Sequence, residues 1–234
     1  MIPNVSKRIN VFLTVLLSLC FAVTAFAADD LKTSIVGGSM EIIKGGKQVV
    51  FTEGAKVTRG ANTLTAEKIV QDKKNNYLEA YGNVNFSGFS NNGERMFMKS
   101  GKALYNMSLD TAEMSQGRPE ITYYMKESTG PLFVQADNIK LNQKKEEILA
   151  VGDVLIISSS ATARSPQALF LQKSRIVVLS GKKQSSIIYT EKGKKDKSQY
   201  KADKITFLLN EKKTLLDGNV TGRIITSKKE KGKK

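Results

Sequence analysis

Apolar and polar residues alternate in short runs along most of the chain after residue 35. The runs are rich in Val, Ile, Thr, Tyr and Phe, and breaks that contain Gly, Asn, Asp and Lys separate them. Alternation with a period of two is typical of strands that bury one face, and no segment after residue 27 keeps the period of a helix. The pattern therefore predicts an all-β fold.

Three of these segments are copies of one another. Each contains Ala, an acidic residue, any residue and Ile, followed by a polar turn with lysine and by a closing Gly, Asn or Asp, and Val. The Ile and the closing Val are separated by 15 residues in every copy, which indicates one structural unit used repeatedly. The copies are LTAEKIVQDKKNNYLEAYGNV at 64–84, VQADNIKLNQKKEEILAVGDV at 134–154 and YKADKITFLLNEKKTLLDGNV at 200–220.

Weaker copies fill the intervals, so that the chain contains about six units. Segment 39–57 keeps the 15-residue separation between Ile42 and Val57, whereas 101–117 and 166–181 keep an apolar strand, a turn and a closing Gly. Each unit predicts a strand, a polar turn and a returning strand, which gives about a dozen strands. We expect the closing Gly to mark a bulge or a close approach of two backbones.

Period two also predicts which side chains share a face. Ile69, Leu78 and Val84 of the first strong copy fall on one side, and stacking of the units would join such faces into one continuous apolar interior. The sequence leaves open whether this interior is a solid core or an apolar trough, because the two have the same composition. The opposite face is polar and contains Lys68, Glu79, Asn138, Lys140, Asp153 and Lys204.

The amino terminus has the layout of a secretory signal peptide. Lys7 and Arg8 precede an apolar run over 11–23, and Ala25-Phe26-Ala27 follows it. This arrangement predicts cleavage between Ala27 and Ala28, whereas an uncleaved membrane anchor is the alternative. Cleavage would remove Cys20 and leave a mature chain without thiol or disulfide chemistry.

Composition excludes several kinds of catalytic site. The 234 residues include no His and a single Cys, so histidine-dependent hydrolysis and zinc sites with imidazole ligands are ruled out. Acidic residues recur at one position of the repeat, as Glu67, Asp137 and Asp203, which is typical of a structural role such as a strand-entry hydrogen bond. No phosphate-binding G-x-x-x-x-G-K-[ST] motif is present. The chain is therefore predicted not to be an enzyme, and no cofactor or metal is expected.

The strong positive charge indicates an anionic partner. Lys and Arg number 37 against 22 Asp and Glu, for a formal charge of +15, which falls to +13 without Lys7 and Arg8. Removing the carboxyl-terminal SKKEKGKK, with five Lys and one Glu, leaves +9 on the repeats. Nucleic acid is disfavoured, since the tyrosines form no stacking motif and the chain is expected to be exported.

The repeats resemble the OstA-like family of lipopolysaccharide transport proteins. The matching residues are VVFTEGAKVTRGANTLTAEKIV and LEAYGNV, between Met40 and Val84, and the later ADNI, GDV, ADKI and DGNV. The resemblance implies a twisted, half-open β-jellyroll whose apolar interior holds lipid acyl chains and whose open edge strands join neighbouring proteins.

From this resemblance we expect a periplasmic bridge protein that carries lipopolysaccharide from the inner to the outer membrane. The expected partners are lipopolysaccharide or a related glycolipid, the inner-membrane transporter complex and outer-membrane translocon of the same pathway, and further copies of the chain joined head to tail. The residues expected to line the lipid-binding interior are Ile42, Val57, Ile69, Leu78, Val84, Phe86, Ile139, Leu141, Val154, Ile156, Ile205, Phe207 and Val220.

The predicted organisation is a cleaved signal peptide at 1–27, a linker at 28–34, the OstA-like repeat domain at 35–226 and a basic disordered tail at 227–234. Two other functions remain open. The chain could be an acceptor of lipopolysaccharide anchored in the inner membrane by its uncleaved amino terminus, or a structural envelope protein with a solid core and no ligand.

Overall fold

The computed structural model describes residues 33–90, 93–125, 130–190 and 197–225. The predicted signal peptide with its Ala27/Ala28 cleavage site, most of the linker and the basic tail lie outside these residues. All regular structure in the described part is β-strand, which confirms the predicted all-β fold. The strands are β1 (Thr33–Val36), β2 (Ser39–Ile43), β3 (Gln48–Thr52), β4 (Ala55–Arg59), β5 (Asn62–Ala66), β6 (Lys68–Asp72), β7 (Tyr77–Phe89), β8 (Arg95–Asn106), β9 (Thr111–Ser115), β10 (Glu120–Tyr124), β11 (Leu132–Gln135), β12 (Asn138–Asn142), β13 (Glu147–Ile157), β14 (Ala161–Leu171), β15 (Ile176–Ser180), β16 (Ser185–Thr190), β17 (Lys197–Ala202), β18 (Lys204–Leu208), β19 (Lys213–Asp217) and β20 (Thr221–Ile225).

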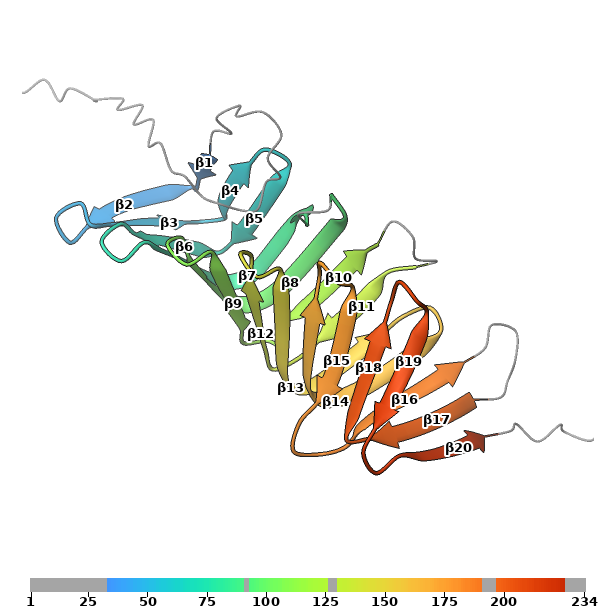
Figure 1. Ribbon diagram of the computed structural model, residues 1–234. Helices are drawn as coiled ribbons and strands as arrows, with labels where there is room; N and C mark the ends of the chain where they lie inside the picture. The colour runs from blue at the N-terminus through green and yellow to red at the C-terminus, as the bar shows by residue number, and fades with distance from the viewer. Residues whose placement is uncertain (1–32, 91–92, 126–129, 191–196, 226–234) are drawn as a thin grey trace, which may run out of the picture.

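The strands form one antiparallel sheet that is folded lengthwise into two facing halves, which we call sheet I and sheet II (Figure 1). Sheet I has the order β2-β3-β6-β7-β8-β9-β12-β13-β14-β15-β18-β19. Sheet II has the order β1-β4-β5-β7-β8-β10-β11-β13-β14-β16-β17-β20. The long strands β7, β8, β13 and β14 belong to both, so the backbone ladder is continuous along the fold between the sheets.

The line where sheet I meets sheet II, here called the corner, is built by the closing Gly of the repeat. In the first strong copy, Gly82 and Asn83 both have positive φ, at 70° and 45°, and the register of β7 against β8 shifts between Tyr81 and Val84. Gly adopts this left-handed region at little cost, and Asn and Asp more readily than other residues, which explains the Gly-[Asn/Asp] pair. The same left-handed pair occurs at Gly152-Asp153 and Gly218-Asn219.

The recurring acid and the closing Gly contact each other at the corner. The backbone N–H of Asp137 donates to the carbonyl oxygen of Gly152 at 2.9 Å. A Cβ at Gly152 would lie 2.3 Å from Oδ2 of Asp137, so only Gly leaves room for the carboxylate. Equivalent contacts join Glu67 to Gly82 and Asp203 to Gly218, so the acids have a structural position in each strong copy.

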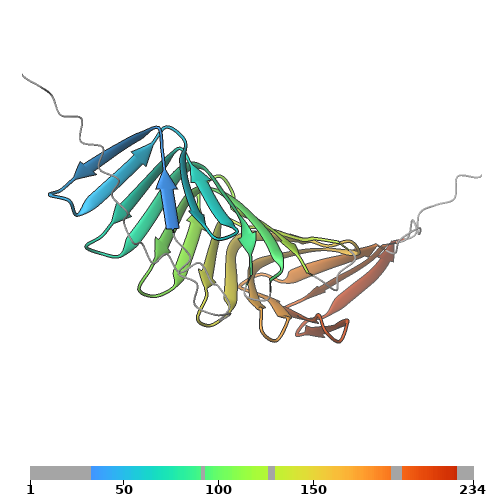
Figure 2. The same ribbon diagram turned by 90° about the horizontal axis from the view of Figure 1, so that it is seen from above.

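The strands of sheet I are joined in pairs by six turns that lie in a row along the edge away from the corner (Figure 2). We call this edge rim I, and the corresponding edge of sheet II rim II. The six turns are 44–47, 73–76, 107–110, 143–146, 172–175 and 209–212. Each is the centre of one predicted unit, so the structure confirms a jellyroll of about six repeated strand-turn-strand units that stays open between the two rims.

Candidate functional site

The predicted interior residues converge between sheets I and II. Eleven of the thirteen point into this space, and Ile69, Ile139, Val154 and Ile205 are fully buried there. Val57, Leu78, Val84, Phe86 and Ile156 are also buried, whereas Leu141 and Phe207 are partly exposed and pack against the same cluster. The apolar interior is continuous from the returning strand of the first repeat to the sixth repeat.

Ile42 and Val220 do not lie in the interior, in contrast to the expectation from their repeat positions. Ile42 is 54% exposed on β2, and Val220 is 50% exposed just before β20. These elements form the two ends of the stack, because among the strands that the structure describes β2 pairs only with β3 and β20 only with β17. The described residues provide no further layer to cover either side chain, although the same repeat positions are buried in the middle of the stack.

Two small cavities lie among the described residues of the packed interior. One, of about 50 Å³, lies between Leu64 and Phe86 of sheet II and Leu78 and Met114 of sheet I. A second, of about 30 Å³, is bounded by residues that include Ile121 and Val177. Ligand pockets usually enclose about 300–1,000 Å³. An acyl chain could therefore enter only if sheets I and II moved apart.

The mouth between the rims is crossed by an ion pair of residues that are 81 positions apart. Arg175, in the fifth turn of rim I, donates from Nη2 to Oε1 of Glu94 on rim II at 2.8 Å. The side chain of Glu94 is 1% exposed and that of Arg175 is 22% exposed. A buried carboxylate needs such a partner, because an uncompensated charge in the interior is costly. We call this contact the clasp.

Tyr123 and Phe170 extend the clasp into the interior. The Tyr123 hydroxyl donates to Oε2 of Glu94, and its ring packs edge-on against Phe170 of sheet I with centroids 6.0 Å apart. Burial, together with the hydrogen bond to Glu94, raises the pKa of Tyr123 to about 12. The hydroxyl therefore stays protonated and remains a donor to the carboxylate at neutral pH.

A second contact crosses the mouth near the carboxyl-terminal end of the stack. The hydroxyl oxygens of Tyr189, on β16 of sheet II, and Thr214, on β19 of sheet I, lie 2.6 Å apart. The rims are thus connected by side chains, whereas the corner is connected by continuous backbone. Separation of the sheets at the rims would break these side-chain contacts and the apolar contacts between the sheets, and would leave the strand ladders intact.

Sequence reasoning did not identify the clasp. Glu94 precedes β8 in a turn that is not part of a repeat motif, and neither its burial nor its distant partner is encoded in local periodicity. Among the described residues, no group of three or more Asp, Glu, His or Cys side chains could hold a metal ion. The same part of the chain contains no helix that is long and apolar enough to cross a membrane.

Comparisons with known proteins find likenesses among solved structures. No family model matches the chain, and no curated protein sequence does. The fold is similar to a crystal structure of LptH from Pseudomonas aeruginosa, described as the LptA-homologous periplasmic component of the conserved lipopolysaccharide transport device. The TM-score is 0.32 and the identity 11%, over 63% of this chain and 81% of the LptH chain.

Proposed function

We propose that the protein binds the acyl chains of lipopolysaccharide, or of a related glycolipid, between sheets I and II. It would carry this lipid across the periplasm as an LptA-like bridge from the inner to the outer membrane, after export and removal of residues 1–27. Its role would be to hold and pass on the lipid without enzymatic chemistry or a cofactor, and an energised partner would supply the direction of movement.

The observation that supports this function most strongly is the continuous apolar interior between two sheets that share backbone along only one side. A closed barrel offers no lateral opening for a charged head group, whereas a sheet folded at one corner opens along its whole length. Acyl chains can then lie inside while the head group stays in water. The side-chain contacts across the mouth are few enough for a ligand to displace.

The free energy gained by burying an acyl chain has to offset the cost of opening the mouth of the groove. Each CH₂ group transferred from water contributes about 0.8 kcal/mol, so about ten methylenes contribute roughly 8 kcal/mol. Loss of a hydrogen-bonded contact across the mouth costs about 0.5–1.5 kcal/mol, or up to about 3 kcal/mol for a charged pair, when the freed groups regain water. One acyl chain of ordinary length therefore offsets the separation of the rims.

The two ends of the stack favour assembly with other β-proteins. Each end has strands with a partner on one side only, β1 and β2 at one end and β19 and β20 at the other. Unpaired N–H and C=O groups on such edges accept added strands. Exposed apolar side chains accompany them, namely Val36, Met40 and Ile42 at the first end and Leu215, Ile224 and Ile225 at the second.

Tryptophan fluorescence tests the proposed site, because the chain has no natural tryptophan. Phe86→Trp places the reporter in the interior, and Tyr81→Trp places it on the outer side of the same strand, β7. Binding of an amphiphile with brominated acyl chains should quench the interior tryptophan and leave the outer one bright. Equal quenching of both, or of neither, would contradict binding between the sheets.

A structural envelope protein with a solid core is the second candidate function. The small size of the two cavities described above and the closed clasp favour it, because neither cavity is large enough for an acyl chain. This candidate predicts that no amphiphile protects or quenches any interior position. An acceptor retained at the inner membrane is distinguished by sequencing the amino terminus of the exported protein, where a start at Ala28 excludes an anchor formed by residues 1–27.

A further inference from the structure

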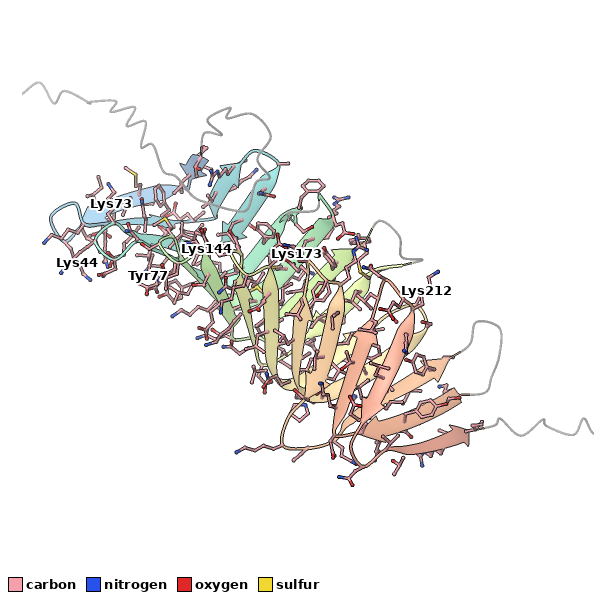
Figure 3. The ribbon with its side chains drawn as sticks, viewed as in Figure 1. Lys44, Lys73, Tyr77, Lys144, Lys173 and Lys212 are labelled. Atoms are coloured by element: carbon pink, nitrogen blue, oxygen red, sulfur yellow. The ribbon has the colours of Figure 1, made fainter. Side chains whose placement is uncertain are left out.

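Rim I carries a row of exposed lysines along the whole length of the stack. Figure 3 shows Lys44, Lys73, Lys144, Lys173 and Lys212 following one another along this edge. The six turns together contain eight lysines and Arg175 against three acids, which gives a net charge of +6. The lysines are all exposed and are Lys44, Lys47, Lys73, Lys74, Lys144, Lys145, Lys173 and Lys212.

Backbone hydrogen bonds between neighbouring turns hold this row in register. Each turn donates to a carbonyl of the turn before it, at 2.9–3.0 Å, as Lys73 to Lys47, Met107 to Asn76, Gln143 to Asp110, Gln172 to Glu146 and Leu209 to Arg175. Successive turns are two strands apart, so their spacing is about 9–10 Å and the row is about 50 Å long. The basic row is therefore a fixed part of the sheet.

Most of these lysines have no partner within the fold. Among the described residues, Lys44, Lys73, Lys173 and Lys212 form no ion pair. Lys144 bridges the third turn, which has no lysine of its own, by contacts to Asp110 at 3.8 Å and to the Ser108 carbonyl at 3.4 Å. Lys144 thus places a cation over the third turn, and the other lysines of the row remain available to bind an anion.

The position of the row indicates which part of a bound amphiphile would contact its lysines. Rim I is one lip of the mouth, so any amphiphile with its chains between the sheets presents its head group beside these turns. We propose that rim I binds the phosphate groups of such head groups, with five of the six turns offering exposed lysines along the groove. This inference rests on the proposed function and adds the head-group site to it.

A row of this form suits a lipid head group better than a bilayer surface. The cations follow a single line one turn wide, whereas a flat anionic bilayer is contacted by a broad face. Lysines on successive turns about 10 Å apart, with Lys144 reaching over the third turn, would also let a head group move along the row. An exposed lysine that pairs with an anion contributes modestly, about 0.2–1 kcal/mol, so no single turn would retain the lipid.

Two matched fluorescent probes test the head-group site: a pyrene-labelled long-chain alcohol and its phosphate monoester. The rim variant is Lys44→Gln/Lys73→Gln/Lys173→Gln, and the control is Lys56→Gln/Lys68→Gln/Lys204→Gln, which removes equal charge from exposed strand positions. At about threefold per lysine, we expect the rim variant to bind the ester roughly 30-fold more weakly than wild type. Its affinity for the alcohol, and the affinity of the control variant for both probes, should stay unchanged.

Ionic strength supplies an independent test of the same site. Raising salt from 0.15 M to 1 M shortens the Debye length from about 8 Å to about 3 Å, so the wild-type preference for the ester should disappear. Inorganic phosphate at the concentration of the ester should not displace it. Displacement at that concentration would mean that rim I takes free phosphate, and would overturn a head-group site.

The remaining outcomes separate this inference from the function on which it rests. Equal weakening of the ester in the rim and control variants would overturn the assignment to rim I. Loss of binding to phosphatidylglycerol vesicles, with unchanged affinity for the ester, would instead make the row a bilayer contact. If neither probe binds wild type, the groove holds no acyl chain and the proposed function fails first, together with the head-group site.

Discussion

Removal of Arg175 tests whether the mouth of the groove is closed in solution. In Arg175→Met the Glu94 carboxylate loses the guanidinium that lies 2.8 Å away, although its side chain is only 1% exposed. Removing one partner of a buried ion pair costs about 3–5 kcal/mol, because the other charge stays desolvated. We therefore expect the free energy of unfolding, measured by urea titration, to fall by about 3 kcal/mol or more.

Arg118→Met is the matched control for this measurement. Arg118 pairs with Asp153 at the same 2.8 Å, but these side chains are 47% and 59% exposed. Exposed pairs contribute about 0–1 kcal/mol, so the control should lose little stability. The double variant Glu94→Gln/Arg175→Met leaves no buried charge and should recover much of the loss. Equal and small effects of both arginine substitutions would show that the clasp is solvated, and would refute a closed mouth.

Three further changes follow from the corner, the clasp and the ends of the stack. In Gly152→Ala the new Cβ would lie 2.3 Å from Oδ2 of Asp137, at a φ of 83°, so the variant should lose about 1–3 kcal/mol of stability in thermal unfolding. In Gly130→Ala the nearest atom, Cβ of Ser159, is 3.6 Å away, so this variant should be nearly neutral. The pKa of Tyr123 is raised from 10.0 to about 12 in the folded protein. Its contribution to the free energy of unfolding is therefore complete below pH 10 and is lost between pH 10 and pH 12. Tyr123→Phe should remove the fall in the free energy of unfolding between pH 10 and pH 12. If the variant shows the same fall as wild type, the Tyr123 hydroxyl is not a buried donor. Ile224→Lys on β20, where the side chain is 74% exposed, should reduce self-association in sedimentation velocity. Leu109→Lys, at a 60% exposed apolar position in a rim I turn, should not.

Local periodicity was sufficient to predict most of the interior. Ile69, Ile139 and Ile205 occupy one repeat position and are all fully buried, because a period of two fixes the face wherever neighbouring strands cover both sides. The failure at Ile42 and Val220 has the same origin. These residues keep the repeat position but lie in the end layers of the stack, and burial depends on having a neighbour that local sequence cannot specify.

The corner and the clasp show two different limits of sequence reasoning. A bulge or a close approach of two backbones was expected at the closing Gly, and the register shift between Tyr81 and Val84 confirms it. The sequence did not indicate that two consecutive left-handed residues, Gly82 and Asn83, turn the chain there from one sheet into the other. The clasp joins Glu94 to Arg175 across 81 residues, and a pairing at that separation depends on the stacking of several repeats. The repeat thus predicts the strands and the buried face of each unit, but it does not predict the side-chain contacts between distant units that close the mouth.

Photo-cross-linking in living cells tests most directly whether acyl chains lie between sheets I and II. A photoreactive amino acid at Ile139, which is fully buried in the interior, is compared with one at Lys140, which is exposed on the outer side of the same strand. We predict a lipopolysaccharide adduct at Ile139 and none at Lys140. Absence of adducts at Ile139 and also at Phe86 and Ile205, in cells that make lipopolysaccharide and a folded protein, would contradict a lipid-carrying groove.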